Sequence, residues 1–532
     1  MDDLLIRGAE VIDGTGAPGR RVDVAVRDGR ISAIGGPDRP ARRVIDAPGA
    51  VLAPGFIDIH THSDFTLPLN QRAESKIRQG VTTEVLGNCG FSVAPALPDR
   101  TELLRSYLAA SAPWLPFHPV TFSTYLDTFP ATSVNTVMQI GHNTLRLMTT
   151  GMEPRAPRAD ELAVMERLLE EALEAGALGL SSGLFTAPGS YASPDELLAL
   201  ARVLRRHAAA YASHVRNEAG RVFAAVDEAI HVGEACGIHI QIAHLKLSGT
   251  DNWGGASALL ARIDEARRRG VRVDVDQYPY TTASNPLRNL LPLWVQDGGL
   301  GAMLERLRDP AVRDRVRQDI AAHGYGSFGR LASWDAVRIA ISPHHGPDAG
   351  QTIGELARRR AEDPLETACD VLVADEGHTR VLLTSMSEAD VQEILRSPVV
   401  LIGSDGVAVA PYGITGQGKP HPRFYGTFVR VLGHYARELR LFSLPEAIHK
   451  MTGGSAAALG LVERGLIREG YWADLTLFEP LAVAEGSTYD DPHRYPAGIT
   501  AVIVNGVIVV DDGKHTGALP GKVLRRGSHG VA

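Results

Sequence analysis

Short apolar runs recur along the middle of the chain, and amphipathic helical patterns separate several of them. The runs lie at 55–60, 81–87, 135–141, 177–183, 211–216, 238–245, 271–278 and 399–405. Strands covered on both faces give continuous apolar runs of this kind. Residues 159–175 carry apolar side chains at helical spacing. A further helix is expected to begin at Ser193, because Pro194 and Glu196 complete a capping-box start. The pattern predicts alternating strands and helices.

Eight strands with intervening helices predict an α/β fold, specifically a (β/α)₈ TIM barrel over residues 55–464. The longest interval between strands lies between 286 and 398, and we expect an insertion around 286–345. An open doubly wound sheet is the alternative architecture. It is less favoured because no G-x-G-x-x-G loop follows a strand and opens a helix.

Both ends of the chain are predicted to be rich in short strands. Asp28-Gly29 and Asn505-Gly506 each lie between apolar stretches, where such pairs form hairpin turns. Strand-rich ends around a different middle suggest one small β domain built from residues 1–54 and 465–532.

Composition excludes several classes of protein. The 532 residues include 54 basic and 62 acidic side chains, a net charge of −8, which gives no electrostatic case for nucleic acid or an anionic membrane. Three cysteines are too few for a disulfide framework. No apolar stretch reaches the roughly 18 residues of a membrane span, and the acidic start does not resemble a signal peptide. We therefore expect a cytoplasmic protein. The oligomeric state stays open.

Histidines and one aspartate follow the predicted strands. His60 and His62 are two residues apart at the end of the first run, where alternate strand residues share a face. His214, His244 and Asp405 end three later runs. The carboxyl ends of barrel strands meet at one mouth, so these side chains are expected to converge on a metal site. Singly, each could equally be a buried structural residue.

The motifs together resemble the N-acyl-D-amino acid deacylases (D-aminoacylases) of the amidohydrolase superfamily. The resemblance runs over nearly the whole chain and rests on PGFIDIHTHSD, LGNCGFS, ASHVRNE, AHLK, DQYPYT, GSDG, HPRFYGTF, REGYWADLTLF and VIVNG. Much of the superfamily carries a carboxylated lysine after strand four, but ALGLSSG contains no lysine. The deacylases are similar in lacking that lysine and in using a cysteine after strand two, which corresponds to Cys89.

The resemblance implies a zinc enzyme. It implies that a tight zinc ion is held by Cys89, His214 and His244. His60 and His62 are then expected to face a second, weaker metal position, with Asp405 between metal and substrate as proton carrier. A thiolate and imidazole set favours zinc on chemical grounds. The other two cysteines, Cys236 and Cys369, are expected to be small buried apolar residues.

Candidate substrate-binding residues lie in the later loops. Lys246 follows His244 by two, so on a strand it shares that face and could pair with the substrate α-carboxylate. Tyr278 and Ser284 resemble the family's carboxylate-binding tyrosine and serine. Two further candidates come from nearby loops, Arg288 and Arg423.

The rest of the pocket is less sharply defined. An inserted segment over 286–345 resembles a lid, although a surface insertion without substrate contact is the simpler alternative. Phe185, Tyr191 and Trp294 are expected to shape an apolar pocket. They favour hydrophobic D-amino acids only weakly, and a second carboxylate on the substrate is left open.

Three functions follow from this sequence. The main hypothesis is zinc-dependent hydrolysis of N-acyl-D-amino acids, small-molecule substrates that give a carboxylate and a free D-amino acid. The second is a cyclic-amide hydrolase of the dihydropyrimidinase or dihydroorotase kind, against which the missing lysine and Cys89 argue. The third is a non-catalytic barrel that serves as a scaffold.

Overall fold

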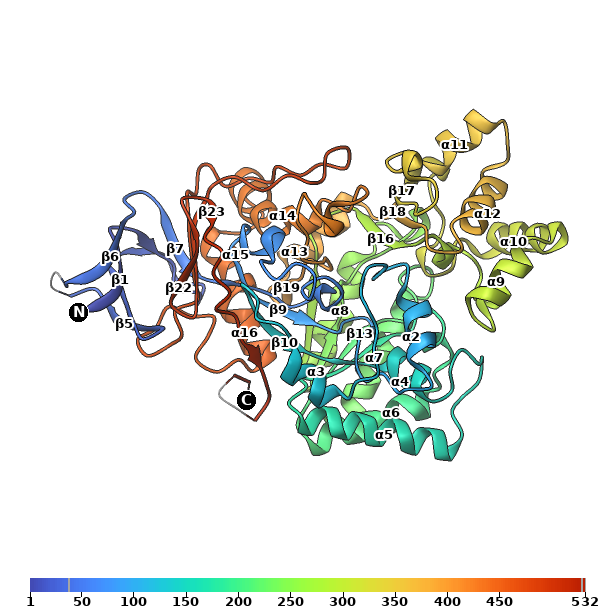
Figure 1. Ribbon diagram of the computed structural model, residues 1–532, viewed down its shortest axis with the longest axis horizontal. Coiled ribbons are helices and arrows are strands. Elements are labelled where there is room, and N and C mark those ends of the chain that lie inside the picture. Colours follow the sequence, from blue (N-terminus) through green and yellow to red (C-terminus); the bar gives the residue numbers. More distant parts are fainter. Residues whose placement is uncertain (37–38, 528–529, 532) are drawn as a thin grey trace.

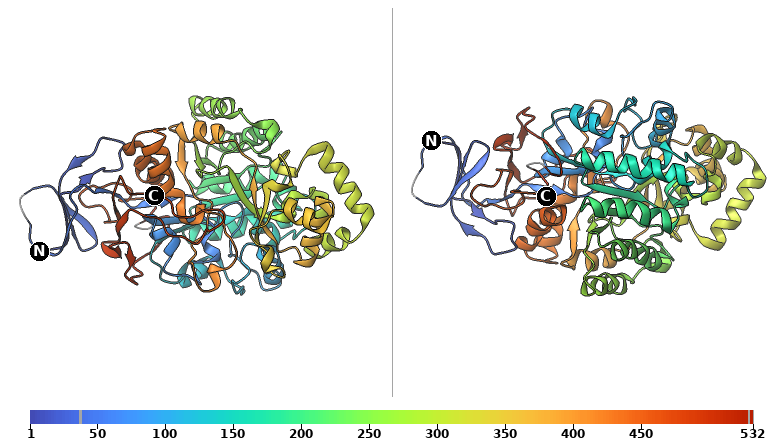
Figure 2. Two further views of the ribbon diagram at one scale, coloured as in Figure 1. Left: turned by 90° about the horizontal axis from the view of Figure 1, so that it is seen from above. Right: turned by 90° about the horizontal axis from the view of Figure 1, so that it is seen from below.

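The structure is a computed structural model that describes residues 1–36, 39–527 and 530–531. Figure 1 shows a central barrel with strands from both chain ends on one side and a smaller inserted unit on the other. The two views of Figure 2 agree, because the N-terminal strands and the inserted unit lie at opposite ends of the long axis. Among the described residues, no helix combines the length and apolar character that crossing a bilayer requires.

The central barrel is built from parallel strands. They are β8 (Phe56–Asp58), β9 (Val81–Leu86), β10 (Asn135–Met138), β11 (Ile140–Gly141), β12 (Gly179–Gly183), β13 (Ala210–His214), β14 (Ile240–Ile242), β15 (Val273–Gln277) and β19 (Val400–Ile402). Each neighbouring pair is parallel. Because β10 pairs with β9 and β11 pairs with β12, these two short strands occupy one position in the barrel.

The barrel closes between its first and last strands, just beyond their carboxyl ends. Thr61 forms a parallel bridge with Gly406, and the Asp405 backbone N–H donates to the His60 carbonyl at 2.8 Å. Counted over the described residues, the closed sheet has eight strand positions, as the apolar runs predicted. The fold is therefore the expected (β/α)₈ barrel.

Helices cover the outside of the barrel. The main ones are α4 (His142–Met148), α5 (Ala159–Glu174), α6 (Pro194–Arg206), α7 (Val222–Cys236), α8 (Ala256–Arg268), α13 (Glu388–Arg396), α14 (Arg423–Arg430), α15 (Leu444–Met451) and α16 (Gly453–Leu459). Half of the capping box predicted for α6 is present, because the Ser193 hydroxyl accepts from the Glu196 N–H at 3.2 Å. The Glu196 carboxylate does not return to the cap; it contacts His142 and Arg146 instead. Shorter helices join the early strands: α1 (Glu74–Ile77), α2 (Thr101–Leu108) and α3 (Phe122–Thr128).

Strands from the two chain ends form a shared sheet. Its order is β23 (Lys514–His515), β22 (Val507–Asp511), β21 (Ile499–Val504), β20 (Leu475–Phe478), β7 (Val51–Pro54), β2 (Glu10–Val11) and β3 (Arg20–Arg21). A second sheet has the order β5 (Arg30–Ile34), β4 (Val24–Arg27), β1 (Asp2–Arg7) and β6 (Ala41–Asp46). Leu4 and Ile6 share an apolar cluster with Leu475 and Ile503. We propose that these sheets form one domain with boundaries near 54 and 465.

Another unit is inserted between β15 and β19. Its antiparallel sheet has the order β16 (Thr282–Pro286), β18 (Arg380–Thr384) and β17 (Val337–Ile341), and its helices are α9 (Leu300–Leu307), α10 (Pro310–His323), α11 (Ile353–Arg360) and α12 (Pro364–Ala374). The unit has its own apolar cluster, which includes Leu287, Phe328, Leu372 and Leu383. This cluster runs well past residue 345, because β18 returns to pair with β16.

Candidate active site at the mouth of the barrel

The histidines, the cysteine and the aspartate singled out in the sequence lie just beyond the barrel strands. His60 and His62 follow the end of β8, and Cys89 follows β9 by three residues. The other three come from later strands: His214 ends β13, His244 follows β14, and Asp405 follows β19. All six lie at the carboxyl mouth of the barrel, and all but the fully buried His60 line one cavity.

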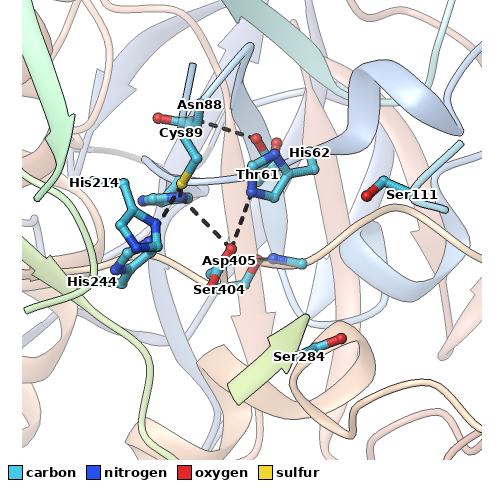
Figure 3. Close-up of polar contacts among 12 residues, drawn as sticks. Thr61, His62, Asn88, Cys89, Ser111, His214, His244, Ser284, Ser404 and Asp405 are labelled. Atoms are coloured by element: carbon cyan, nitrogen blue, oxygen red, sulfur yellow. Dashed lines mark hydrogen bonds and ion pairs between the residues drawn. The ribbon is translucent and has the colours of Figure 1, made fainter. Parts of the chain in front are cut away.

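These six side chains form two groups that share Cys89. The possible ligand atoms of Cys89, His214 and His244 lie within 4.8 Å of one another, as do those of His60, His62, Cys89 and Asp405. The Cys89 sulfur is 3.3 Å from Nε2 of His60 and 3.3 Å from Nε2 of His244. Figure 3 shows the sulfur between the His214–His244 pair and the His62–Asp405 pair. The chain therefore brings together every side chain predicted to hold metal.

Asp405 lies between the histidines and an arginine. Its Oδ1 is 3.1 Å from Nε2 of His62 and 3.7 Å from Nε2 of His60, and its Oδ2 is 3.0 Å from Nη2 of Arg423. Burial alone raises the pKa of a carboxyl, but Arg423 and the histidines hold the pKa of Asp405 well below its usual value. The carboxylate is therefore ionised and able to accept a proton.

The donor set fits a zinc ion. Burial lowers the pKa of His214 and His244 well below the usual value, so both imidazoles are neutral, the form that binds metal. Burial raises the pKa of the Cys89 thiol, and coordination is what deprotonates a thiol in such surroundings. The Nε2 atom of His214 is buried, makes no well-directed hydrogen bond among the described residues and lies 3.2 Å from Oε1 of Glu218. One sulfur, several imidazoles and a carboxylate are ligands that zinc commonly takes.

Three of these residues have strained backbones. Cys89, His244 and Asp405 have φ angles of 54°, 34° and 49°, in the left-handed region that residues other than glycine seldom adopt. Each such residue costs about 1–3 kcal/mol, and strain of this kind gathers at functional sites. Nine other described residues besides glycine share this conformation, but these three are the ones whose side chains belong to the metal-binding groups.

Two buried carboxylates that contact the predicted site residues were not predicted. Asp276, on β15, accepts from the His244 N–H at 2.9 Å and from Gln241 Nε2 at 2.7 Å. Glu218 accepts from Lys246 Nζ at 2.6 Å. Only their positions in the sequence could have indicated them. Glu218 stands four residues after His214, and Asp276 lies on a predicted strand, where every second side chain points inward.

Lys246 and Tyr278 both line the cavity. The strand expected to align Lys246 with His244 ends at Ile242, so that reasoning was wrong and both residues lie in the following loop. Lys246 Nζ is 2.6 Å from His244 Nδ1 and is paired with Glu218. The buried Tyr278 hydroxyl has no hydrogen-bond partner in the described part of the chain, and the Arg423 guanidinium lies 4.6 Å from its ring centre.

The other substrate candidates come largely from the inserted unit. Ser284, on β16, accepts a hydrogen bond from Arg380 Nη2 at 3.2 Å, and Arg288 Nη2 donates to the Tyr107 carbonyl at 3.1 Å. Arg423 Nε and Nη1 are buried without partners among the described atoms. Arg380 was not singled out in the sequence, because it begins β18, a strand of the inserted unit that is not among the eight apolar runs predicted for the barrel.

The aromatic residues expected around the pocket separate into two kinds. Phe185 stacks on His214 with ring centres 3.7 Å apart and lines the cavity. Tyr191 and Trp294 instead hydrogen-bond to Asp297 and Asp319 and are not part of the cavity wall. Their predicted role in the pocket was wrong, because Trp294 packs against the apolar cluster of the inserted unit and Tyr191 connects the segment before α6 to that unit.

The position of the superfamily's bridging lysine is occupied by small residues. Strand β12 reads Gly-Leu-Ser-Ser-Gly, and the Ser181 hydroxyl donates to the Gly87 carbonyl beside Cys89. Gly90 follows Cys89 with φ 78°, and a Cβ there would meet the Gly183 nitrogen at 2.7 Å. This close approach packs the cysteine loop directly against strand four.

Comparison with known proteins places the chain in a family. The family model described as "Amidohydrolase family" matches residues 43–510. The chain is 36% identical to a D-aminoacylase, 37% to an N-acyl-D-glutamate deacylase and 38% to an N-acyl-D-aspartate deacylase, all from Alcaligenes xylosoxydans xylosoxydans. These alignments cover 98%, 98% and 99% of this chain and 98%, 96% and 95% of the relatives. The chain therefore belongs to the amidohydrolase family.

Solved structures agree with this placement. An N-acyl-D-glutamate deacylase from Bordetella bronchiseptica, in complex with zinc and a phosphonate mimic of the tetrahedral intermediate, has a TM-score of 0.81 and 36% identity, covering 98% of this chain and 99% of that one. A D-hydantoinase structure has a TM-score of 0.55 with 14% identity over 99% of this chain. That likeness supports the fold alone, whereas the deacylase is similar in both sequence and structure.

Proposed function

We propose that this chain is a zinc-dependent hydrolase that cleaves the linear amide of N-acyl-D-amino acids into a carboxylate and a free D-amino acid. The observation that carries the proposal is the position of Cys89, which is shared by two groups of metal-binding side chains with Asp405 beside them. Full-length similarity to three deacylases supports the substrate class and its D configuration.

Each metal-binding group has a proposed part. Cys89, His214 and His244 would hold the tight zinc ion. A second, weaker position would be faced by His60, His62 and Asp405. When bound, zinc polarises the scissile carbonyl and lowers the pKa of a water molecule to about 7.

Asp405 is the proposed proton carrier. Its carboxylate is ionised, lines the cavity and is held between His62 and Arg423, so it can take a proton from the attacking water. The same carboxyl group can then deliver that proton to the amide nitrogen. This second transfer is needed because an amine is a poor leaving group until it is protonated.

The substrate α-carboxylate is proposed to bind next to Asp405. The carbon that bears it is bonded to the amide nitrogen, so this carboxylate must lie close to the proton carrier. The unpartnered Tyr278 hydroxyl and the unpartnered Arg423 nitrogens are the donors available there. Lys246 contributes positive charge from the same wall, although Glu218 already neutralises much of it.

The acyl group is proposed to occupy the apolar part of the cavity. Phe65, Phe91, Leu108 and Trp114 line that part together with Phe185. The inserted unit supplies Asn285, Pro286, Arg288, Ile341 and Arg380 to the same cavity. We therefore propose that the insertion forms one wall of the substrate site.

The test is a panel of N-acetyl amino acids assayed with zinc-loaded protein, before and after chelation. We expect hydrolysis of D substrates, no comparable hydrolysis of L substrates or hydantoins, and loss of activity with chelator that zinc restores. Activity on cyclic amides alone would support the dihydropyrimidinase alternative. Full zinc occupancy without any hydrolysis would support the scaffold alternative.

A further inference from the structure

The cavity contains more positive charge than its own acids neutralise. Apart from histidines, its charged lining residues are Glu218, Asp405, Lys246, Arg288, Arg380 and Arg423. Both acids are already used, since Glu218 pairs with Lys246 at 2.6 Å and Asp405 pairs with Arg423 at 3.0 Å. Within the described residues, no carboxylate pairs with Arg288 or Arg380.

Arg380 is held in place by neutral groups only. Its Nη1 donates to the Ser111 hydroxyl at 2.7 Å, and its Nη2 donates to the Ser284 hydroxyl at 3.2 Å. Burial, followed by repulsion from Arg423, lowers the pKa of Arg380 to about 10. This guanidinium is buried, and no described carboxylate lies within ion-pair distance of it. The Asp405 carboxylate, which is paired with Arg423, offsets only part of the cost of burial, so an anionic ligand group would relieve the rest.

Arg288 increases the same positive charge. Its Nη1 and Nη2 donate only to backbone carbonyls, those of Gly377 and Tyr107. Burial lowers its pKa below the usual value. Arg288 and Arg380 line the same cavity and repel each other, so a ligand with an anionic group between them is favoured.

The position of Arg380 separates it from the reaction centre. Figure 3 shows its two hydroxyl partners, Ser111 and Ser284, to the right of the metal-binding side chains; in that view Asp405 lies between Cys89 and Ser284. The α-carboxylate of the substrate must stay near Asp405, beside the unpartnered donors of Tyr278 and Arg423. A group farther along the amino acid side chain can reach past them to Arg380.

We propose that Arg380, together with Arg288, binds a second carboxylate of the substrate, so that the preferred substrates are N-acyl derivatives of the acidic amino acids D-aspartate and D-glutamate. This inference rests on the proposed function and narrows it. It replaces the weak preference for hydrophobic side chains that the aromatic residues suggested. Sequence identity to the relatives does not favour either kind of substrate. The chain is 37% and 38% identical to the deacylases named for D-glutamate and D-aspartate, and 36% identical to the D-aminoacylase.

The first experiment uses the zinc-loaded wild-type protein. N-acetyl-D-glutamate and N-acetyl-D-aspartate are compared with their uncharged isosteres, N-acetyl-D-glutamine and N-acetyl-D-asparagine, and with N-acetyl-D-leucine. We expect kcat/KM for the better acid to exceed that of its amide isostere by about 100-fold, because only the acid forms charge-assisted hydrogen bonds with the two arginines.

The second experiment assigns the preference to Arg380. Arg380→Met removes the charge and keeps much of the length, so we expect kcat/KM for the acid to fall about 100-fold and that for the isostere to change less than threefold. Arg358→Met is the matched control, because Arg358 is an exposed arginine of the same inserted unit, paired with Asp335. It should leave both values unchanged. Arg380→Lys, which keeps the charge, should retain part of the preference.

Product binding gives a readout without turnover. Calorimetry should detect tighter binding of D-glutamate than of D-glutamine to the wild-type protein, and Arg380→Met should remove the difference. Equal losses for acid and isostere in Arg380→Met would overturn the role given to Arg380.

The wild-type panel separates the two proposals. Hydrolysis of N-acetyl-D-leucine or N-acetyl-D-glutamine as fast as the acids would overturn the inference and leave the deacylase function intact. Failure on every D substrate with zinc bound would overturn both.

Discussion

The Asp276 carboxylate lies 3.0 Å from Nδ1 of His60, and both side chains are completely buried. The contact directs Nε2 of His60 toward the Cys89 sulfur, 3.3 Å away. Gly403 permits this arrangement, because a Cβ there would meet His60 Cβ at 2.6 Å and Asp276 Oδ1 at 3.0 Å. A carboxylate behind a histidine fixes the ring orientation and raises its basicity as a metal ligand.

The first prediction concerns this pair. Asp276→Asn keeps the shape of the side chain but removes its charge, so His60 loses the partner that fixes its tautomer. We expect the zinc affinity of the second position, which His60 faces, to fall about 10–100-fold, while the tight zinc at Cys89, His214 and His244 stays bound. Competition with a chromogenic chelator measures the affinity, and Asp274→Asn is the control. Asp274 lies on the same strand but pairs with His239. Equal affinities in wild type and Asp276→Asn would contradict the prediction.

The second prediction tests the shared ligand. Cys89→Ala removes the one sulfur common to both groups, and we expect the tight zinc to be lost on dialysis, together with activity. Metal content is measured by mass spectrometry of the dialysed protein. Cys236→Ala is the control, since Cys236 is buried in α7 away from the site. A Cys89→Ala protein that kept one zinc ion per chain would rule out this ligand set.

The third prediction concerns the proton carrier. Asp405→Asn preserves the side-chain shape and leaves Cys89, His214 and His244 intact, so tight zinc should remain. Turnover should fall by about 100–10,000-fold, because the asparagine side chain cannot take a proton from water and pass it to the leaving nitrogen of the substrate. Steady-state rates and metal content are measured on the same preparation. A near-normal rate with zinc present would remove Asp405 from the mechanism.

The sequence predicted the barrel well because its signal is local. Each apolar run overlaps one strand position of the barrel, and helix starts such as the Ser193 cap depend on neighbours in the chain. Because the carboxyl ends of all barrel strands meet at one mouth, residues that are distant in the sequence come together there once the strands are known. That is why the metal-binding side chains could be expected to converge.

The surroundings of those side chains could not be predicted in the same way. Asp276 and His60 are 216 positions apart, and nothing local to either residue indicates the contact. Lys246 was expected to face substrate, but Glu218 from another loop neutralises it. Arg380 escaped notice because an inserted unit brings it back to the cavity through the pairing of β18 with β16.

The last prediction uses a buried acid beside the site. Asp64 follows His62 by two residues, and no described side chain donates a hydrogen bond to its carboxylate; the backbone N–H groups of Asp64 and Gly87 stabilise its charge only in part. Burial raises its pKa from 3.8 to about 8. Between these values the folded protein binds a proton that the unfolded chain releases, so this group makes the protein less stable as pH rises from about 4 to 8.

Asp64→Asn removes that titration. The variant should therefore gain stability relative to wild type as pH rises from 4 to 8, by at most about 5 kcal/mol, since each pKa unit is worth about 1.4 kcal/mol. Melting temperatures of both proteins across this range measure the difference, and protonation of the metal-binding residues cancels because it is common to both. Asp99→Asn is the control, because Asp99 is an exposed aspartate whose replacement shows how much any loss of a surface carboxyl changes the melting temperature. A constant difference between Asp64→Asn and wild type would show that Asp64 is already ionised in the folded state, with a partner that compensates its charge.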